Sequence, residues 1–236
     1  MKRFTAVTIA LAAVLAAALP AFAQDDWQVI ERHDNTGASG AGAKVPQPKA
    51  DAKLVVACGE NAHPATEPYK SIVSQLNDLY GTSFPVYESV RVMSPHASSG
   101  GCIFYNRDFL ASLMGNWMKI DDPSAAQPML YAIFAHELGH LSHDDFSSRN
   151  QGGPPKNREL AADQFAGYTV ERLGVRRLDP DEVTKYYQLT GDDFTGGASG
   201  HGTGDERTNA FLDGWHRAEV GLPESSGRPA GGMGEP

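Results

Sequence analysis

Two histidines and a glutamate lie close together near the middle of the chain, in the segment His136-Glu137-Leu138-Gly139-His140. On a helix, residues four positions apart lie on one face, so this spacing lets two imidazoles bind a single metal ion. Glu137 lies beside them, close enough to reach a water on the metal. The pattern H-E-x-x-H therefore predicts two zinc ligands, His136 and His140, and a general base. The alternative is a histidine pair on an ordinary helix, and a third ligand would separate the two.

A third ligand is offered by the segment Asn157-Arg158-Glu159-Leu160-Ala161-Ala162-Asp163. Glu159 would complete a site of two histidines and one glutamate, which holds one zinc ion per chain and leaves its fourth position open. Asp163, one helical turn later, is spaced to accept the free N–H of a ligating histidine. The alternative for Glu159 is a solvent-facing charge in the first turn of a helix, where the helix dipole favours it.

Two helices must bring these side chains together. The first spans Met129–His143, where apolar residues recur at helical spacing and form a stripe that can face a core. The second begins near Asn157 and ends near Gly174. Between them, Gly152-Gly153-Pro154-Pro155 is typical of a loop in which the chain reverses direction. The apolar stripe of the first helix consists of Leu130, Phe134, Leu138 and Leu141.

H-E-x-x-H followed by E-x-x-A-D resembles the signature of the gluzincin zinc metallopeptidases. The resemblance is to the branch of the CAAX prenyl endopeptidases and the bacterial heat-shock membrane proteases, and it extends from about Val86 to Trp215. It implies a mostly helical α+β domain of zincin type with a small antiparallel or mixed sheet, whose edge strand lies beside the H-E-x-x-H helix. In that likeness the edge strand is Cys102–Asn106, which would bind an extended peptide by backbone pairing.

The same resemblance extends to the late element His-Pro-x4-Arg, which His201 and Arg207 match in spacing. It implies that His201 either assists the substrate carbonyl oxygen as a catalytic residue or closes the open zinc position, and that Arg207 braces this segment against the acidic wall of the site. A structural loop histidine is the alternative for His201. Gly202 stands where the family has proline, and the interval from His140 to Glu159 is shorter than in the membrane-embedded members.

The composition along the chain predicts four regions. Residues 1–23 have Lys2 and Arg3, an apolar run and small residues at the end, which is typical of a signal peptide cleaved after Ala23. An uncleaved membrane anchor is the alternative, but the run is shorter than the roughly 20 residues that a span needs. Residues 24–50 are polar and predict a flexible lead-in, residues 51–220 the metallopeptidase domain, and residues 221–236 a disordered tail. We therefore expect a periplasmic or secreted protein without a membrane segment after cleavage.

Cys58 and Cys102 are the only cysteines. Because export places them in an oxidising compartment, we expect them to form a disulfide.

The formal net charge is −9, without basic clusters, which argues against nucleic acid as a partner. The expected partner is a protein or peptide substrate, and the expected function is an exported zinc endopeptidase. The alternative is a chaperone or adaptor that keeps the fold and zinc but only binds unfolded proteins. Glu137 favours the enzyme, because a scaffold has no use for a general base.

Other periodic segments predict the elements around the site. Strands are expected at Ala52–Ala57, Pro85–Met93 and Cys102–Asn106, with a loop at Pro95–Gly101. Further helices are expected at Tyr69–Tyr80, Arg107–Met118, Asp179–Leu189 and Asp205–Val220.

Overall fold

The computed structural model describes residues 53–89, 91–92, 94–120, 123–151, 154–175, 179–195 and 200–225. The predicted signal peptide, the lead-in and residues 226–236 of the predicted tail lie outside these residues. Within the described ranges, no helix combines the length and apolar character needed to cross a membrane.

The expected α+β class is confirmed, with a small mixed sheet and a larger helical part. The strands are β1 (Val55–Ala57), β2 (Glu60–Pro64), β3 (Val86–Glu88), β4 (His96–Ala97) and β5 (Ile103–Tyr105). The helices are α1 (Tyr69–Tyr80), α2 (Arg107–Ser112), the π-helix η2 (Leu113–Met118), α3 (Pro123–Ser142), α4 (Pro155–Arg172), α5 (Pro180–Thr190), α6 (Asp192–Thr195) and α7 (Gly204–Glu219).

The sheet has the strand order β1-β2-β3-β5-β4. β3 and β5 are parallel, and the other neighbours are antiparallel. The expectation that Cys102–Asn106 forms the edge strand was wrong, because β5 lies between β3 and β4. The edge beside α3 is β4, in a segment that the sequence predicted to be a loop.

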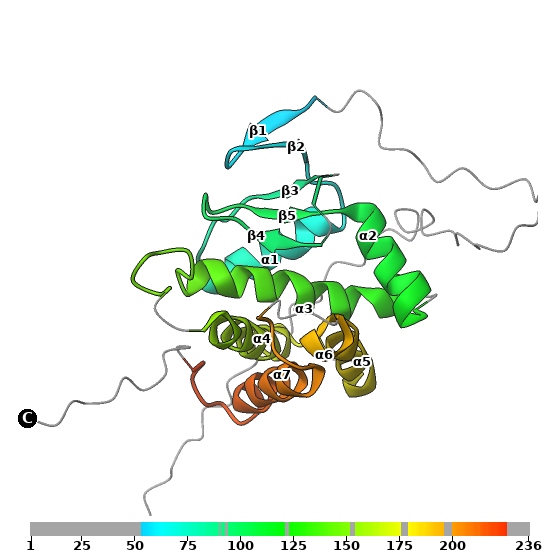
Figure 1. Cartoon of the computed structure of the whole chain (residues 1–236), viewed down its shortest axis with the longest axis vertical. Helices are drawn as coiled ribbons and strands as arrows, with labels where there is room; N and C mark the ends of the chain where they lie inside the picture. Colours follow the sequence, from blue (N-terminus) through cyan, green and yellow to red (C-terminus); the bar gives the residue numbers. More distant parts are fainter. Residues whose placement is uncertain are drawn as a thin grey trace, which may run out of the picture.

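Helix α3 forms the centre of the molecule, between the sheet and the helices α4, α5 and α7 (Figure 1). Residues 128–140 are all buried or nearly so. The sequence predicted a single apolar stripe, but both sides of this helix are covered, which is why its apolar residues are not confined to one face. Its core contacts include Met129, Leu130, Tyr131, Ile133, Phe134 and Leu138.

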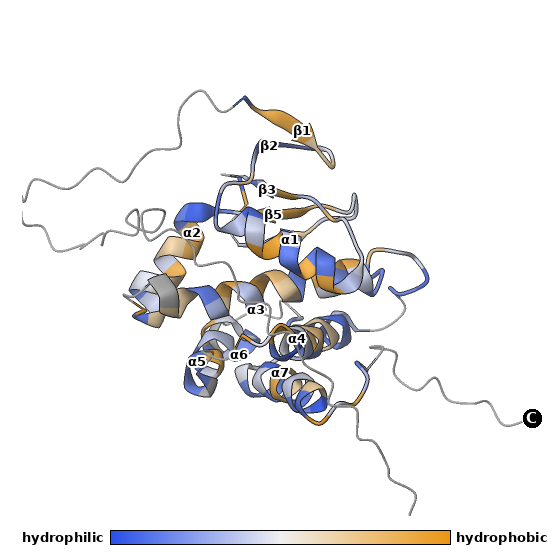
Figure 2. Cartoon of the chain, turned by 180° about the vertical axis from the view of Figure 1, so that it is seen from behind, coloured by the Kyte–Doolittle hydropathy of each residue, from blue (hydrophilic) through white to orange (hydrophobic). Residues whose placement is uncertain are grey.

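Helix α1 packs against both α3 and the sheet. Its hydrophobic and hydrophilic residues lie on different faces (Figure 2), and Ile72, Val73 and Leu76 are buried in the core. The helix ends at Gly81, whose φ of 63° is the left-handed conformation that favours glycine after a helix. The predicted boundaries Tyr69–Tyr80 are confirmed.

Two glycines set the close crossing of α4 and α7. A Cβ atom on Gly167 would lie 1.9 Å from the carbonyl oxygen of Phe211, and one on Gly214 would lie 1.8 Å from that of Gln164. Any side chain would therefore push these helices apart. This crossing positions Arg207 on α7 against α4.

Candidate metal site

Helix α3 carries His136, Glu137 and His140 in its last two turns. His136 and His140 are only 9% and 8% exposed, and Glu137 is 8% exposed. Their Nε2 atoms point toward each other at a separation of 3.1 Å. The H-E-x-x-H spacing therefore places two imidazole nitrogens, each able to bind a metal, side by side in a nearly buried position.

Helix α4 brings Glu159 to the same point. Its Oε2 lies 3.4 Å from Nε2 of His136, and its Oε1 lies 3.6 Å from Nε2 of His140. Gly139 allows this approach, because a Cβ there would lie 3.2 Å from Cα of Ala162 on α4.

These three side chains fit a tetrahedral metal ion. Metal–ligand distances of about 2.0–2.1 Å in a tetrahedron place the ligand atoms about 3.3–3.4 Å apart. The observed separations among His136, His140 and Glu159 are 3.1, 3.4 and 3.6 Å. It is the only group of three or more potential ligands found in the part of the chain that the structure describes.

Asp163 contacts His136 at Nδ1, the ring nitrogen that does not face His140. Its Oδ1 lies 2.7 Å from Nδ1 of His136, and the residue is fully buried on α4. Arg207 donates to both of its oxygens, from Nε at 2.8 Å and from Nη2 at 2.9 Å. Arg207 also donates to the hydroxyl of Thr190 and lies over the ring of Tyr187. Asp163 thus contacts His136 directly, and Arg207 contacts Asp163.

Asp145 holds His140 in the same way, and sequence reasoning missed it. Its Oδ2 lies 2.8 Å from Nδ1 of His140, and it is 9% exposed. The signal available in the sequence was an aspartate five residues after the second histidine, but its approach depends on a turn that the sequence does not reveal.

The charges around His136, His140 and Glu159 shift the pKa values of these groups strongly. Burial lowers the pKa of His136, but the Asp163 carboxylate outweighs it and raises the pKa to about 9. Burial likewise opposes the effect of Asp145 and Glu159 on His140, whose pKa rises to about 10. The pKa of Glu159 is lowered despite its burial, because its carboxylate lies 3.4 and 3.6 Å from the imidazoles of His136 and His140, which stabilise its charged form. Protons and a metal ion therefore compete for the same nitrogens.

Glu137 is directed to the sheet. Its Oε2 accepts a hydrogen bond from the backbone N–H of Ala97, on edge strand β4, at 2.7 Å. The two strand residues pair with β5 through His96↔Phe104 and Ala97↔Ile103. The general base predicted from the sequence is thereby joined to the open edge of the sheet.

His201 lies at the border of the site. Its Nε2 is 3.8 Å from Oε2 of Glu159, and its side chain is 44% exposed. Asp192 accepts from the backbone N–H of Gly202 at 3.1 Å and so holds the loop. The φ of Gly202 is 94°, which proline cannot adopt, so this turn differs from the one implied by the family resemblance.

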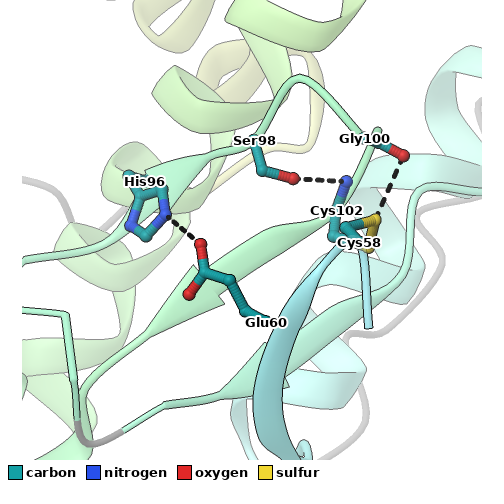
Figure 3. The surroundings of a disulfide bond; sticks show 6 residues. All are labelled: Cys58, Glu60, His96, Ser98, Gly100 and Cys102. Atoms are coloured by element: carbon teal, nitrogen blue, oxygen red, sulfur yellow. Dashed lines mark hydrogen bonds and ion pairs between the residues drawn. A yellow bond between two sulfur atoms is a disulfide. The ribbon is translucent and has the colours of Figure 1, made fainter. Parts of the chain in front are cut away.

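The disulfide joins Cys58, in the turn between β1 and β2, to Cys102, just before β5 (Figure 3). Cys102 belongs to a small second core with Ala57, Ala62 and Phe104, separate from the main core that contains α3. Oε1 of Glu60 lies 3.6 Å from Nε2 of His96, and this pair is a further link between the β1–β2 hairpin and β4.

Comparison of the chain with protein-family models, with curated proteins and with solved structures finds no match. What this site can do is therefore given by its own side chains.

Proposed function

We propose that this chain is an exported zinc-dependent endopeptidase that hydrolyses peptide bonds of extended or misfolded envelope proteins. The observation that carries this proposal is the convergence of His136, His140 and Glu159, with the carboxylate of Glu137 fixed between them and the edge strand. The likeness of both motifs to gluzincin metallopeptidases supports the same function. The signal-peptide pattern and the disulfide support export to an oxidising compartment.

Zinc, when bound, supplies a Lewis acid that lowers the pKa of water from about 15.7 to about 7. Glu137 takes the proton from the attacking water and passes it to the leaving amine nitrogen. The hydrogen bond from Ala97 occupies Oε2 of Glu137. Among the described residues Oε1 has no hydrogen-bond partner, so this second oxygen serves for the proton transfer.

Asp163 and Asp145 keep Nδ1 of each histidine engaged, so Nε2 is the atom left for the metal. His201 lies beside Glu159 at the open side of the site. It serves either as the donor to the substrate carbonyl oxygen or as a gate over the fourth ligand position. Arg207 acts through Asp163 and does not touch the substrate.

We propose that the substrate binds as an extended strand along β4. Among the described residues, this strand is one of the two edges of the sheet; it contacts α3, and the backbone N–H of its Ala97 donates to Glu137. An extended peptide that pairs with this edge would carry its carbonyl groups past the general base. Folded proteins do not offer such a strand, so the proposal favours unfolded or extended substrates.

The decisive variant is Glu137→Gln, which keeps an oxygen to accept from Ala97 but cannot take a proton. We expect purified wild-type protein to hold about one zinc ion and to cleave casein in a chelator-sensitive way. The variant should keep zinc and fold but lose activity by about 10²–10⁴-fold. Persistent cleavage by the variant would contradict the mechanism. Zinc binding and retention of unfolded casein without cleavage by the wild type would indicate the chaperone alternative.

A further inference from the structure

Asp145 belongs to neither of the two sequence motifs, yet it contacts a metal ligand. Its Oδ2 is 2.8 Å from Nδ1 of His140. Because Nδ1 is engaged there, the ring turns Nε2 toward His136 and Glu159. An imidazole that is fixed through one nitrogen presents the other to a metal in a defined direction and tautomer.

The turn after α3 is shaped to make this contact. Asp144 adopts a φ of 55°, the left-handed conformation in which aspartate and asparagine are tolerated. This reversal lets the backbone N–H of Asp145 donate to the carbonyl oxygen of His140 at 3.1 Å. The side-chain amide of Asn150 braces the turn by donating to the carbonyl oxygens of His143 and Asp144. Asp145 therefore meets both the backbone and the ring of His140.

The two supporting carboxylates differ in their charge environment. Both oxygens of Asp163 accept from Arg207, so a cation shares its charge. Within the described residues, the carboxylate of Asp145 has no lysine or arginine in an ion pair. Among the described residues, its negative charge faces His140 without a neighbouring cation, and such a carboxylate makes an imidazole a stronger metal ligand.

We propose that Asp145 is a positioning residue that fixes the orientation and tautomer of His140 for metal binding. This inference rests on the proposed metal site but not on peptide hydrolysis. The second histidine of the motif would thus depend on a residue outside it, as the first depends on Asp163.

The test compares three variants. Asp145→Leu removes both the acceptor and the charge, and Asp145→Asn keeps an acceptor without the charge. Asp144→Asn is the matched control, since it removes one negative charge from the neighbouring residue and suits a positive φ. Zinc affinity is measured by competition with a chromophoric chelator. The Nδ1–H resonance of His140 is followed by NMR in protein labelled with ¹⁵N-histidine.

We expect Asp145→Leu to weaken zinc binding by about 10–100-fold and to lose the hydrogen-bonded Nδ1–H resonance. Asp145→Asn should keep the resonance and lose less affinity, while Asp144→Asn should match the wild type. Wild-type zinc affinity in Asp145→Leu would overturn the inference. Should that variant fail to fold, a wild-type spectrum without a hydrogen-bonded Nδ1–H resonance of His140 would overturn it instead.

These outcomes separate this inference from the proposed function. A wild-type chain that binds zinc but cleaves no peptide would remove the peptidase and leave the role of Asp145 intact. Conversely, zinc binding that is indifferent to Asp145 would leave the peptidase proposal standing.

Discussion

Arg207 holds Asp163 by both carboxylate oxygens, at 2.8 and 2.9 Å, in a part of the core where Asp163 has no exposed surface. The oxygen nearer to Nη2 also contacts Nδ1 of His136. A residue on α7 is therefore connected, through one side chain of α4, to a proposed metal ligand on α3.

Removing Arg207 should destabilise the whole fold. Arg207→Met leaves the Asp163 carboxylate buried without its cation, which costs about 3–5 kcal/mol of unfolding free energy. Lys156 and Glu206 provide the control, since this half-exposed pair also joins α4 to α7. Lys156→Met should cost less than about 1 kcal/mol. Urea unfolding of both variants measures the difference. Similar losses of unfolding free energy in Arg207→Met and Lys156→Met would contradict the prediction that the buried Arg207–Asp163 pair matters more than the exposed one.

Adding a methyl group at Gly139 should separate the two ligand-bearing helices. A Cβ there meets Cα of Ala162 and Cδ1 of Phe165, each at 3.2 Å. We expect Gly139→Ala to cost about 1–3 kcal/mol and to weaken zinc binding, because Glu159 would move away from the histidines. Gly115→Ala, with open space at its Cβ, is the control and should change neither quantity appreciably. Unchanged zinc affinity in Gly139→Ala would show that the helices need not pack this closely.

Tyr80 should make the protein sensitive to alkali. Burial raises its pKa from 10.0 to about 12, although its hydrogen bond with Thr169 opposes the shift. Because the pKa of Tyr80 is higher in the folded state than in the unfolded state, burial of the neutral phenol contributes fully to the unfolding free energy below pH 10. This stabilisation is lost as the pH rises toward 12. The slope is about 1.4 kcal/mol per pH unit for one proton.

Tyr80→Phe removes this ionisation, so its unfolding free energy should fall less steeply between pH 10 and 12 than that of the wild type. Part of the decline should remain, because burial also raises the pKa of Tyr105 to about 12. Denaturant unfolding at several pH values, together with absorbance titration of the phenols, measures both effects. Identical slopes for variant and wild type would contradict the prediction.

The longer helices could be predicted from the sequence because apolar periodicity and end residues act locally. The bounds Tyr69–Tyr80 with Gly81 as the cap illustrate this, and so does Asp179, which caps α5 by accepting from the N–H of Asp181. The trio His136, His140 and Glu159 was accessible for the same reason: the helical repeat fixes two ligands relative to each other, and a short reversal supplies the third.

The rest depended on tertiary contacts. Strand β4 has only His96 and Ala97, too few residues to show an alternating pattern, and pairing with β5 alone makes it a strand. β2 is polar along most of its length and was not expected either. Asp145 was missed because its approach to His140 requires the positive φ of Asp144, a conformation that residue type alone rarely indicates.

The position of α3 between the sheet and the other helices limits which substitutions this helix can accept during evolution. A helix that touches solvent on one side can exchange polar residues there at little cost, but α3 is enclosed over residues 128–140. Its histidines and glutamate are tolerated inside only because each has a polar partner. Loss of a partner would leave a buried polar group without a hydrogen bond, so replacing any of these three residues would also require the middle of the molecule to repack.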